Sequence, residues 1–189
     1  MRVFAVIAHK FNCEINLNDL PGSGRVDVIA RCINAAIFLS HSIRRDVLFF
    51  MYAPRCNLRI KIDSSVVRYL NPDERSTAAL IRNAVIKRDK NEVKSSPGFF
   101  VKEENFHEFL EELKNFGEIY YLHEEGEDLR GVEFSENSVF VLSDSVNLTE
   151  EEEREIKKEA NKCVSIGNVS MLASHVICVV NNELDRRLP

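Results

Sequence analysis

The sequence lacks the features that mark membrane proteins, disulfide-rich proteins and zinc proteins. None of its apolar runs approaches the roughly 20 residues that a membrane-spanning helix needs, so we expect no membrane partner. Its cysteines are few, odd in number and widely spaced, with no C-x-x-C pair. This spacing argues against a disulfide framework and against a zinc site, so we expect reduced thiols and no bound metal. The cysteines are Cys13, Cys32, Cys56, Cys163 and Cys178.

The chain also lacks internal repeats and low-complexity linkers. A chain of 189 residues without them is expected to form one domain, residues 1–189, with a sizeable core. We divide it into a basic N-terminal part, about residues 1–97, and a C-terminal part, about residues 98–189. The first residues form a short apolar run with no small-residue cleavage pattern after it, which favours a buried strand over a signal peptide. We therefore expect a cytoplasmic protein.

Charge is distributed unevenly along the chain. The net charge of −5, taken alone, disfavours a nucleic-acid partner. Residues 1–59, however, contain eight Lys or Arg and four Asp or Glu, so this part carries +4 and the rest of the chain carries −9. One interpretation is an anionic partner bound over the N-terminal half. The other is the uneven charge that many small proteins have.

A long amphipathic helix is predicted over Gly24–Asp46. At 3.6 residues per turn, its polar side chains fall on one stripe, and apolar side chains cover most of the remaining surface. The stripe combines both signs of charge with an amide and an imidazole, unlike the interchangeable Lys and Glu of a solvated face. It is either a binding face or a polar face that meets solvent or a partner subunit. Its members are Asp27, Arg31, Asn34, His41 and Arg45.

Strands and helices are predicted to alternate, which gives an α/β fold with a mostly parallel sheet flanked by helices. Apolar runs predict strands at Val3–Ala8, Val47–Ala53, Phe99–Val101, Ile119–Leu122, Ser138–Leu142 and Cys163–Ser165. Further helices are predicted at Asn71–Lys87, Asn105–Lys114, Thr149–Asn161 and Ser170–Asp185. A hairpin is predicted from Leu58–Ile62 and Val66–Leu70, and a surface loop from Asp89–Pro97.

Three of the predicted strands end in polar, flexible sequences: Leu122-His123, Leu142-Ser143 and Ser165–Asn168. In open α/β sheets, ligands bind beyond the carboxyl ends of the strands, where loops offer backbone donors and acceptors. The sequence therefore predicts a cofactor pocket at these ends. The alternative is that all three are ordinary strand-to-helix turns, which use the same residue types.

Several motifs point to one protein family. The block from Leu17 to Asp46 reads L-N-D-L-P-G-S-G-R-V-D-V-I-A-R-C-I-N-A-A-I-F-L-S-H-S-I-R-R-D and is long enough to be specific. Later come P-D-E-R at Pro72–Arg75, Y-L-H at Tyr121–His123, and a motif that ends at His175. Together these segments strongly resemble the TrmY family, the tRNA pseudouridine N1-methyltransferases of the SPOUT superfamily. The resemblance covers essentially the whole chain.

This resemblance carries expectations about fold, activity and cofactor. It implies a SPOUT-type fold with a trefoil knot in the C-terminal part, an obligate homodimer, and S-adenosyl-L-methionine held by the knot loops. It implies methylation of N1 of a pseudouridine in the T-loop of tRNA, at position 54 of the tRNA. Transferred by motif, the cofactor contacts are Leu122, Ser143, Ile166, Gly167, Asn168, Val169, Ser170, Met171 and Val176.

Three positions depart from the family pattern. Ser143 stands where the family usually has glycine, Ile166–Val169 where it usually has a proline-containing loop, and Val176 where it usually has cysteine. Because these loops bind largely through main-chain groups, the departures bear on cofactor affinity more than on the pocket itself. Ser143 matters most, since its Cβ lies where the backbone approaches the ligand. Two alternative functions follow: a knotted RNA-binding module without catalysis, or a methyltransferase for a different RNA pseudouridine.

The chemistry of methyl transfer nominates a carboxylate. The N1 of pseudouridine carries a weakly acidic N–H, so a nearby carboxylate can act as a base or as an orienting group. Asp19, in the loop before the long helix, is the sequence-based candidate. The alternative is that Asp19 caps the turn beside Pro21-Gly22.

Four arginines are candidates for phosphate contacts with tRNA: Arg25, Arg31, Arg44 and Arg45. Each also has a structural alternative. Arg31 lies one helical turn from Asp27 and can pair with it, and Arg44 or Arg45 can pair with Asp46 or with the other subunit.

Overall fold

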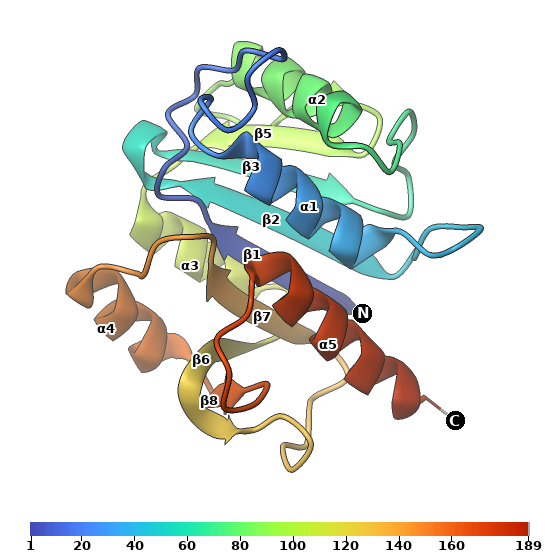
Figure 1. The fold of residues 1–189 in the computed structure, drawn as a ribbon. Coiled ribbons are helices and arrows are strands. Elements are labelled where there is room, and N and C mark those ends of the chain that lie inside the picture. The colour runs from blue at the N-terminus through green and yellow to red at the C-terminus, as the bar shows by residue number, and fades with distance from the viewer. Residues whose placement is uncertain (189) are drawn as a thin grey trace.

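The computed structural model describes residues 1–188, which form one eight-stranded sheet with helices on both faces (Figure 1). The strand order is β4-β5-β3-β2-β1-β7-β6-β8. The strands are β1 (Arg2–Ile7), β2 (Val47–Ala53), β3 (Leu58–Asp63), β4 (Val93–Ser96), β5 (Phe99–Glu103), β6 (Glu118–Asp128), β7 (Ser138–Ser143) and β8 (Lys162–Ser165). The helices are α1 (Val26–Ile37), α2 (Glu74–Ile86), α3 (Phe106–Lys114), α4 (Glu150–Glu159) and α5 (Ala173–Arg186), with a short 3₁₀ turn, η1 (Pro54–Cys56).

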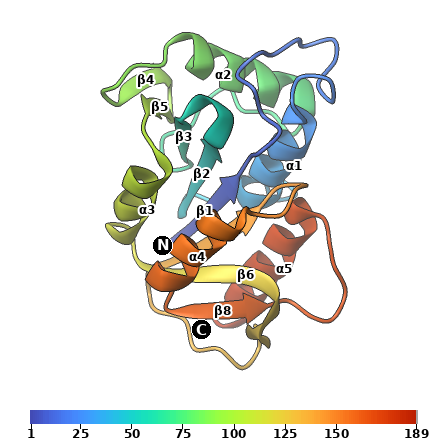
Figure 2. The ribbon, with the colours of Figure 1, turned by 90° about the vertical axis from the view of Figure 1, so that its left-hand side faces the viewer.

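Five neighbouring strands, from β2 to β8 in the sheet order, pair in parallel. The central strand β1 is buried along its whole length, as expected for a parallel strand that helices cover on both sides. Its side chains alternate between two cores: Phe4 and Val6 belong to the core beneath α1, α2 and α5, whereas Val3 and Ile7 belong to the core beneath α3 and α4. Figure 2 shows these two helix layers on opposite sides of the sheet. The predicted α/β class is confirmed.

The predicted hairpin between Leu58–Ile62 and Val66–Leu70 is wrong. Strand β3 pairs antiparallel with β2 on one side and with β5 on the other, so neither of its edges is free to pair with residues 66–70. Residues 66–70 form no strand; instead, the buried Val67 packs so close to Gly98 that a Cβ at Gly98 would lie 2.5 Å from the Val67 Cα. The predicted surface loop Asp89–Pro97 contains β4, an edge strand paired with β5.

Helix α1 ends at Ile37, nine residues before the predicted end at Asp46. Phe38 is extended and forms an isolated β-bridge with Ile43, so the chain turns away from the helix axis at this point. The predicted polar stripe is therefore correct for Asp27, Arg31 and Asn34 and wrong for His41 and Arg45, which lie beyond the end of the helix. The other predicted helices are present, with ends that differ by at most three residues from those expected.

The expectation that all five cysteines are reduced is wrong. Cys13 and Cys56 form a disulfide, with Cα atoms 6.4 Å apart, and the other three cysteines are free. Cys13 follows β1 and Cys56 follows β2. These strands are parallel neighbours, so their following loops meet at the same edge of the sheet, which spacing along the sequence does not reveal.

Strand β6 continues past its predicted end at Leu122 as far as Asp128. Its register against β8 shifts between Leu122 and Glu127, so β6 bends and then pairs with β8 again. Gly126 lies at this bend, where a Cβ would be 2.4 Å from the Val164 nitrogen. The bend therefore requires glycine, because a side chain at this position would clash with the backbone of β8. No helix among residues 1–188 has the length and apolar character needed to cross a membrane.

Candidate functional site

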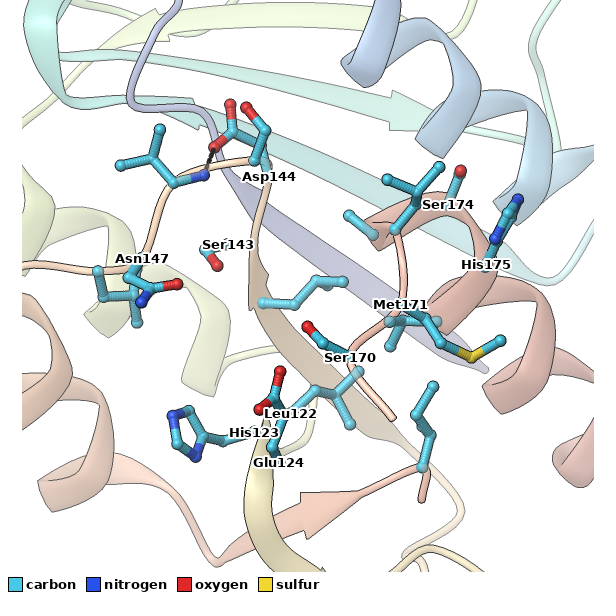
Figure 3. A pocket seen from close by; sticks show the side chains of 18 of the residues that line it. Leu122, His123, Glu124, Ser143, Asp144, Asn147, Ser170, Met171, Ser174 and His175 are labelled. Atoms are coloured by element: carbon cyan, nitrogen blue, oxygen red, sulfur yellow. Dashed lines mark hydrogen bonds between the residues drawn. The ribbon is translucent and has the colours of Figure 1, made fainter. Parts of the chain in front are cut away.

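A cavity of about 820 Å³ lies at the carboxyl ends of β6, β7 and β8 (Figure 3). Leu122 of β6, Ser143 of β7 and Ser165 of β8 all line it, so the three predicted strand ends meet in one place. The first helical turns of α1 and α5 complete the wall. The volume is in the range of about 300–1,000 Å³ that small-molecule sites usually have.

Most of the residues nominated for cofactor binding line this cavity. Asn168 is the exception: it lies on the same loop, is exposed, and does not line the cavity. The loop after β8 is held at its start by Ser165, whose hydroxyl accepts the Gly167 N–H (3.2 Å) and donates to the Gly167 carbonyl oxygen (3.0 Å). The nominated residues that line the cavity are Leu122, Ser143, Ile166, Gly167, Val169, Ser170, Met171 and Val176.

Ser143 is the last residue of β7 and pairs in regular register with Ile7 of β1. It is half-buried and lines the cavity, and its backbone needs no conformation that favours glycine. The sheet therefore accommodates the Cβ of Ser143 without strain, and the hydroxyl adds a polar group to the cavity wall (Figure 3).

Arg25, Val28 and Arg31 form the α1 side of the cavity. Arg25 precedes the helix in the left-handed region, at φ 61°, and its guanidinium donates to both carboxylate oxygens of Asp27 at 3.0 Å. Arg31 donates to the same carboxylate at 2.6 Å and to Glu74 of α2 at 2.9 Å. One buried carboxylate thus fixes two arginines that remain 37% and 39% exposed at the cavity.

The protonation of this arginine pair follows from its contacts. Burial raises the pKa of Asp27, but hydrogen bonds from Arg25 and Arg31 outweigh it, so the net pKa lies below the ordinary aspartate value. The hydrogen bond with Asp27 raises the pKa of Arg25. Both shifts favour the charged forms of Asp27 and Arg25, and the two arginines are paired with two carboxylates, those of Asp27 and Glu74.

The early family motifs come together beside α1. Asp73 of the P-D-E-R segment caps α2 by accepting the Ser76 N–H at 2.8 Å, and Arg75 donates to Asn18 at 3.2 Å. Asp19 lies in the same loop as Asn18, is exposed, and does not line the cavity. Its Oδ1 accepts the Gly22 N–H at 2.9 Å, which is the turn geometry of the alternative interpretation.

Arg44 and Arg45 lie at the opposite end of α1 from the cavity. Arg44 makes a two-pronged ion pair with Asp185 of α5, and Arg45 donates to the Ser64 carbonyl oxygen at 3.0 Å. Neither lines the cavity. The structure therefore divides the four nominated arginines into a cavity pair, Arg25 and Arg31, and a distal pair, Arg44 and Arg45.

Sequence analysis missed Asp144, which follows β7 and lines the cavity. The residue is only 8% exposed. Its N–H donates to the Ile7 carbonyl oxygen at 3.1 Å, and its Oδ1 accepts the Val146 N–H at 3.1 Å. Its Oδ2 is buried, and no group among residues 1–188 donates to it. The available signal was position: an aspartate one residue beyond the end of a central parallel strand.

Burial raises the pKa of Asp144 above the ordinary aspartate value, although backbone hydrogen bonds and nearby positive charge oppose this shift. A buried acceptor without a donor costs about 1–3 kcal/mol. Such a group is characteristic of functional sites more than of stabilising contacts.

Comparison with known proteins identifies the family. A family model described as "Putative SAM-dependent RNA methyltransferase" matches residues 1–188. The chain belongs to this family. Its resemblance to the tRNA pseudouridine N1-methyltransferases, expected from the motifs, is confirmed.

Two relatives of this methyltransferase show how far the similarity extends. A protein of Methanococcoides burtonii named tRNA (pseudouridine(54)-N(1))-methyltransferase is 46% identical over 197 residues, covering 100% of this chain and 98% of the relative. A protein of the same name from Methanocella arvoryzae is 45% identical over 195 residues, covering 99% and 100%. Among solved structures, Archaeoglobus fulgidus Nep1 bound to S-adenosylhomocysteine has a TM-score of 0.69 at 14% identity, covering 98% of this chain and 97% of Nep1, and so shares its fold.

The cavity residues fit S-adenosylmethionine, the methyl donor of the family. Leu122, Leu142 and Ile166 supply apolar walls for a purine ring, and the main chain of the loop Ile166–Leu172 supplies donors and acceptors. No group of three or more His, Cys, Asp or Glu side chains within residues 1–188 is arranged to hold a metal ion.

Proposed function

We propose that this methyltransferase modifies N1 of pseudouridine at position 54, in the T-loop of tRNA, with S-adenosylmethionine as the methyl donor. The relatives that carry this activity in their names match nearly the whole chain at 45–46% identity. The observation that carries the proposal is the composition of one cavity. It combines the loops that the family motifs assign to the cofactor with the cavity arginine pair, Arg25 and Arg31.

Within this proposal, the residues divide into a cofactor side and an RNA side. Leu122, Ser143 and the loop Ile166–Met171 hold the cofactor, and Val176 of α5 covers it. The bound cofactor supplies an electrophilic methyl group on sulfur. Arg25 and Arg31 contact phosphates of the tRNA, because their guanidinium groups are charged, partly exposed and fixed by Asp27.

Roles for the remaining nominated residues stay predictions. Asp19 is the predicted base or orienting group. It would act from the loop that contacts Arg75, while its Oδ1 still accepts the Gly22 N–H that holds the turn. Arg44 and Arg45 would extend the RNA surface away from the cavity, although both already bind partners within this chain.

We also propose a trefoil knot, a homodimer and a cytoplasmic location. The knot is supported by the path of the chain, which crosses from β7 to β8 at the sheet edge and then returns to place α5 beside α1 (Figure 1). The homodimer is supported by apolar side chains exposed in the loop between β8 and α5: Val169 is 73% exposed and Leu172 is 62% exposed. A tRNA substrate supports the cytoplasmic location.

Methyl transfer to defined tRNAs tests the proposal. The protein is incubated with S-adenosylmethionine labelled in its methyl group and with two matched tRNAs, one with pseudouridine at position 54 and one with uridine there. We expect label only in the first tRNA, as N1-methylpseudouridine at that position. Equal labelling of both tRNAs, or labelling of neither, contradicts the proposal. Label at another pseudouridine shows that the substrate position is wrong.

A further inference from the structure

The two carboxylate oxygens of Asp144 differ in what surrounds them. Oδ1 accepts the Val146 N–H and so holds the turn after β7. Oδ2 is buried with no donor among residues 1–188, on a residue that is 8% exposed and lines the cavity. A turn-forming role explains the first oxygen and leaves the second unexplained, because a turn does not require a buried acceptor without a donor.

Asp144 also lies where the two sides of the cavity meet. It directly follows Ser143, one of the residues assigned to the cofactor, and its charge acts on Arg25, the arginine at the start of α1. Asp144, Arg25 and the loop after β8 therefore line one and the same cavity. We propose that Asp144 is a catalytic residue whose Oδ2 accepts the N1 proton of the target pseudouridine; this inference rests on the proposed function.

The step balances with the groups that the proposed function provides. The N1–H bond breaks and its proton goes to Oδ2, so Asp144 becomes neutral. The electron pair freed on N1 forms the new N–C bond. The S–C bond of the sulfonium donor breaks at the same time, and the electron pair of that S–C bond remains on sulfur. The proton then leaves to solvent when the product departs, which restores the carboxylate.

Surrounding charges set the acidity of Asp144. Burial raises its pKa, which improves it as a proton acceptor, and the positive groups that follow β1 oppose that rise. The charged or titratable groups near the carboxylate are His9 and Lys10 after β1, Arg25 and Cys32 of the α1 segment, and, along the same cavity, Arg31, His123, Glu124, Glu153 and His175.

Asp144→Asn tests the inference, because it removes the proton acceptor and keeps an oxygen for the Val146 N–H. Asp89→Asn is the matched control: Asp89 makes the same turn, accepting the Asn91 N–H at 2.9 Å, but is exposed and does not line the cavity. Single-turnover methyl transfer to pseudouridine-54 tRNA is measured together with S-adenosylhomocysteine affinity by calorimetry and with tRNA affinity. We expect Asp144→Asn to lose about 100-fold in rate, with both affinities within threefold of the parent protein. Asp89→Asn should match the parent in all three.

Several results overturn the inference. A rate loss of less than tenfold shows that Oδ2 takes no proton in the reaction. A full loss accompanied by tenfold weaker S-adenosylhomocysteine binding places Asp144 in cofactor binding instead. If the parent protein does not methylate the pseudouridine-54 tRNA, the proposed function fails and the inference fails with it, whereas an active parent and an active Asp144→Asn variant overturn the inference alone.

The parent protein offers a second test that needs no variant. With Asp144 as the proton acceptor, kcat/KM for tRNA falls as pH decreases through the raised pKa of Asp144. A profile that stays flat as pH falls to the ordinary pKa of aspartate, about 4, contradicts the assignment.

Discussion

Arg59 and Asp144 are both buried charged side chains, yet their surroundings are opposite. Arg59 of β3 is 1% exposed, and its guanidinium is surrounded by three carboxylates: Glu92 at 2.6 Å, Glu104 at 3.2 Å and Glu112 at 2.8 Å. Asp144 has one oxygen with a donor and one without among residues 1–188. Arg59 lies in the antiparallel half of the sheet, and Asp144 lies at the carboxyl end of a parallel strand.

The difference in their partners distinguishes a buried charge that holds elements together from a buried charge that is left available to a ligand. Arg59, Lys61 and Lys102 together balance the three carboxylates, so this cluster joins β3, α3 and the segment before β4, and none of its members lines the cavity at the ends of β6, β7 and β8. Burial raises the pKa of Asp144, a shift that is characteristic of carboxylates in functional sites. The antiparallel half therefore contains the paired charge cluster, and the parallel half contains the cavity with the unpaired carboxylate oxygen.

The largest effect on stability is expected from Arg59→Met. This substitution leaves Glu104, whose side chain is 0% exposed, without its buried cation. We expect a loss of about 3–5 kcal/mol in the free energy of unfolding, measured by urea titration. Arg55→Met, at an exposed arginine on the neighbouring turn, is the control and should change it by less than about 0.5 kcal/mol. Equal effects of the two substitutions would refute the structural role of the cluster.

Next in size is the contribution of the cavity arginine pair to tRNA binding. Glutamine at Arg25 and Arg31 keeps a hydrogen-bond donor for Asp27 and removes both positive charges. We expect tRNA affinity to fall about tenfold or more, and the slope of log affinity against log salt to shrink by about 0.7–0.9 per lost contact. Glutamine at Arg44 and Arg45 is the comparison. A larger loss of tRNA affinity from the substitutions at Arg44 and Arg45 would show that the RNA binds at the far end of α1 instead.

Stability is also expected to depend on pH in the acid range. Burial raises the pKa of Asp185, but hydrogen bonds from Arg44 and Arg2 outweigh it, so its net pKa lies below the ordinary value, and the same balance holds for Asp27. A lowered pKa stabilises the folded state above about pH 4. That contribution is lost as pH falls through the lowered values. The urea midpoint should drop between about pH 5 and pH 3, and Asp185→Asn should show a smaller drop. Identical pH profiles would exclude Asp185 as a source.

The smallest expected effect is a gain in stability from Asp144→Asn. Because burial raises the pKa of Asp144, its charged form disfavours folding at neutral pH, and asparagine removes that cost. We expect Tm to rise by roughly 2–4 °C at pH 7, which corresponds to about 1 kcal/mol. The gap should close as pH falls toward 4, where the carboxyl of the parent protein is protonated. A lower Tm for the variant at pH 7 would show that the charge stabilises the fold.

Local pattern predicted the parallel half of the molecule well and the antiparallel half poorly. Strand β1 and helix α5 have apolar periodicities that specify their burial, so their types could be predicted from sequence. The pairing of β3 with β5 could not, because both Val66–Leu70 and Phe99–Val101 have the pattern of a partner strand. Choosing between them depends on contacts distant in sequence. The Cys13–Cys56 disulfide was missed for the same reason.

The location of the candidate site could be predicted from the sequence, but only some of the residues that form it could be. Strand ends identified the cavity, and the family motifs named most of the residues that line it. The arginines on Gly24–Asp46 could not be sorted from sequence, because periodicity does not reveal that α1 stops at Ile37. Asp144 was missed because its distinguishing property, a buried oxygen without a donor, exists only in three dimensions.

The central claim is that the buried carboxylate at the end of β7 serves methyl transfer. The most direct measurement is the single-turnover rate of methylation of pseudouridine-54 tRNA by the parent protein and by Asp144→Asn, at saturating S-adenosylmethionine and tRNA. The account predicts a rate about 100-fold lower for the variant, in a protein that is folded and binds both ligands. A variant that methylates this tRNA at the rate of the parent protein would contradict it.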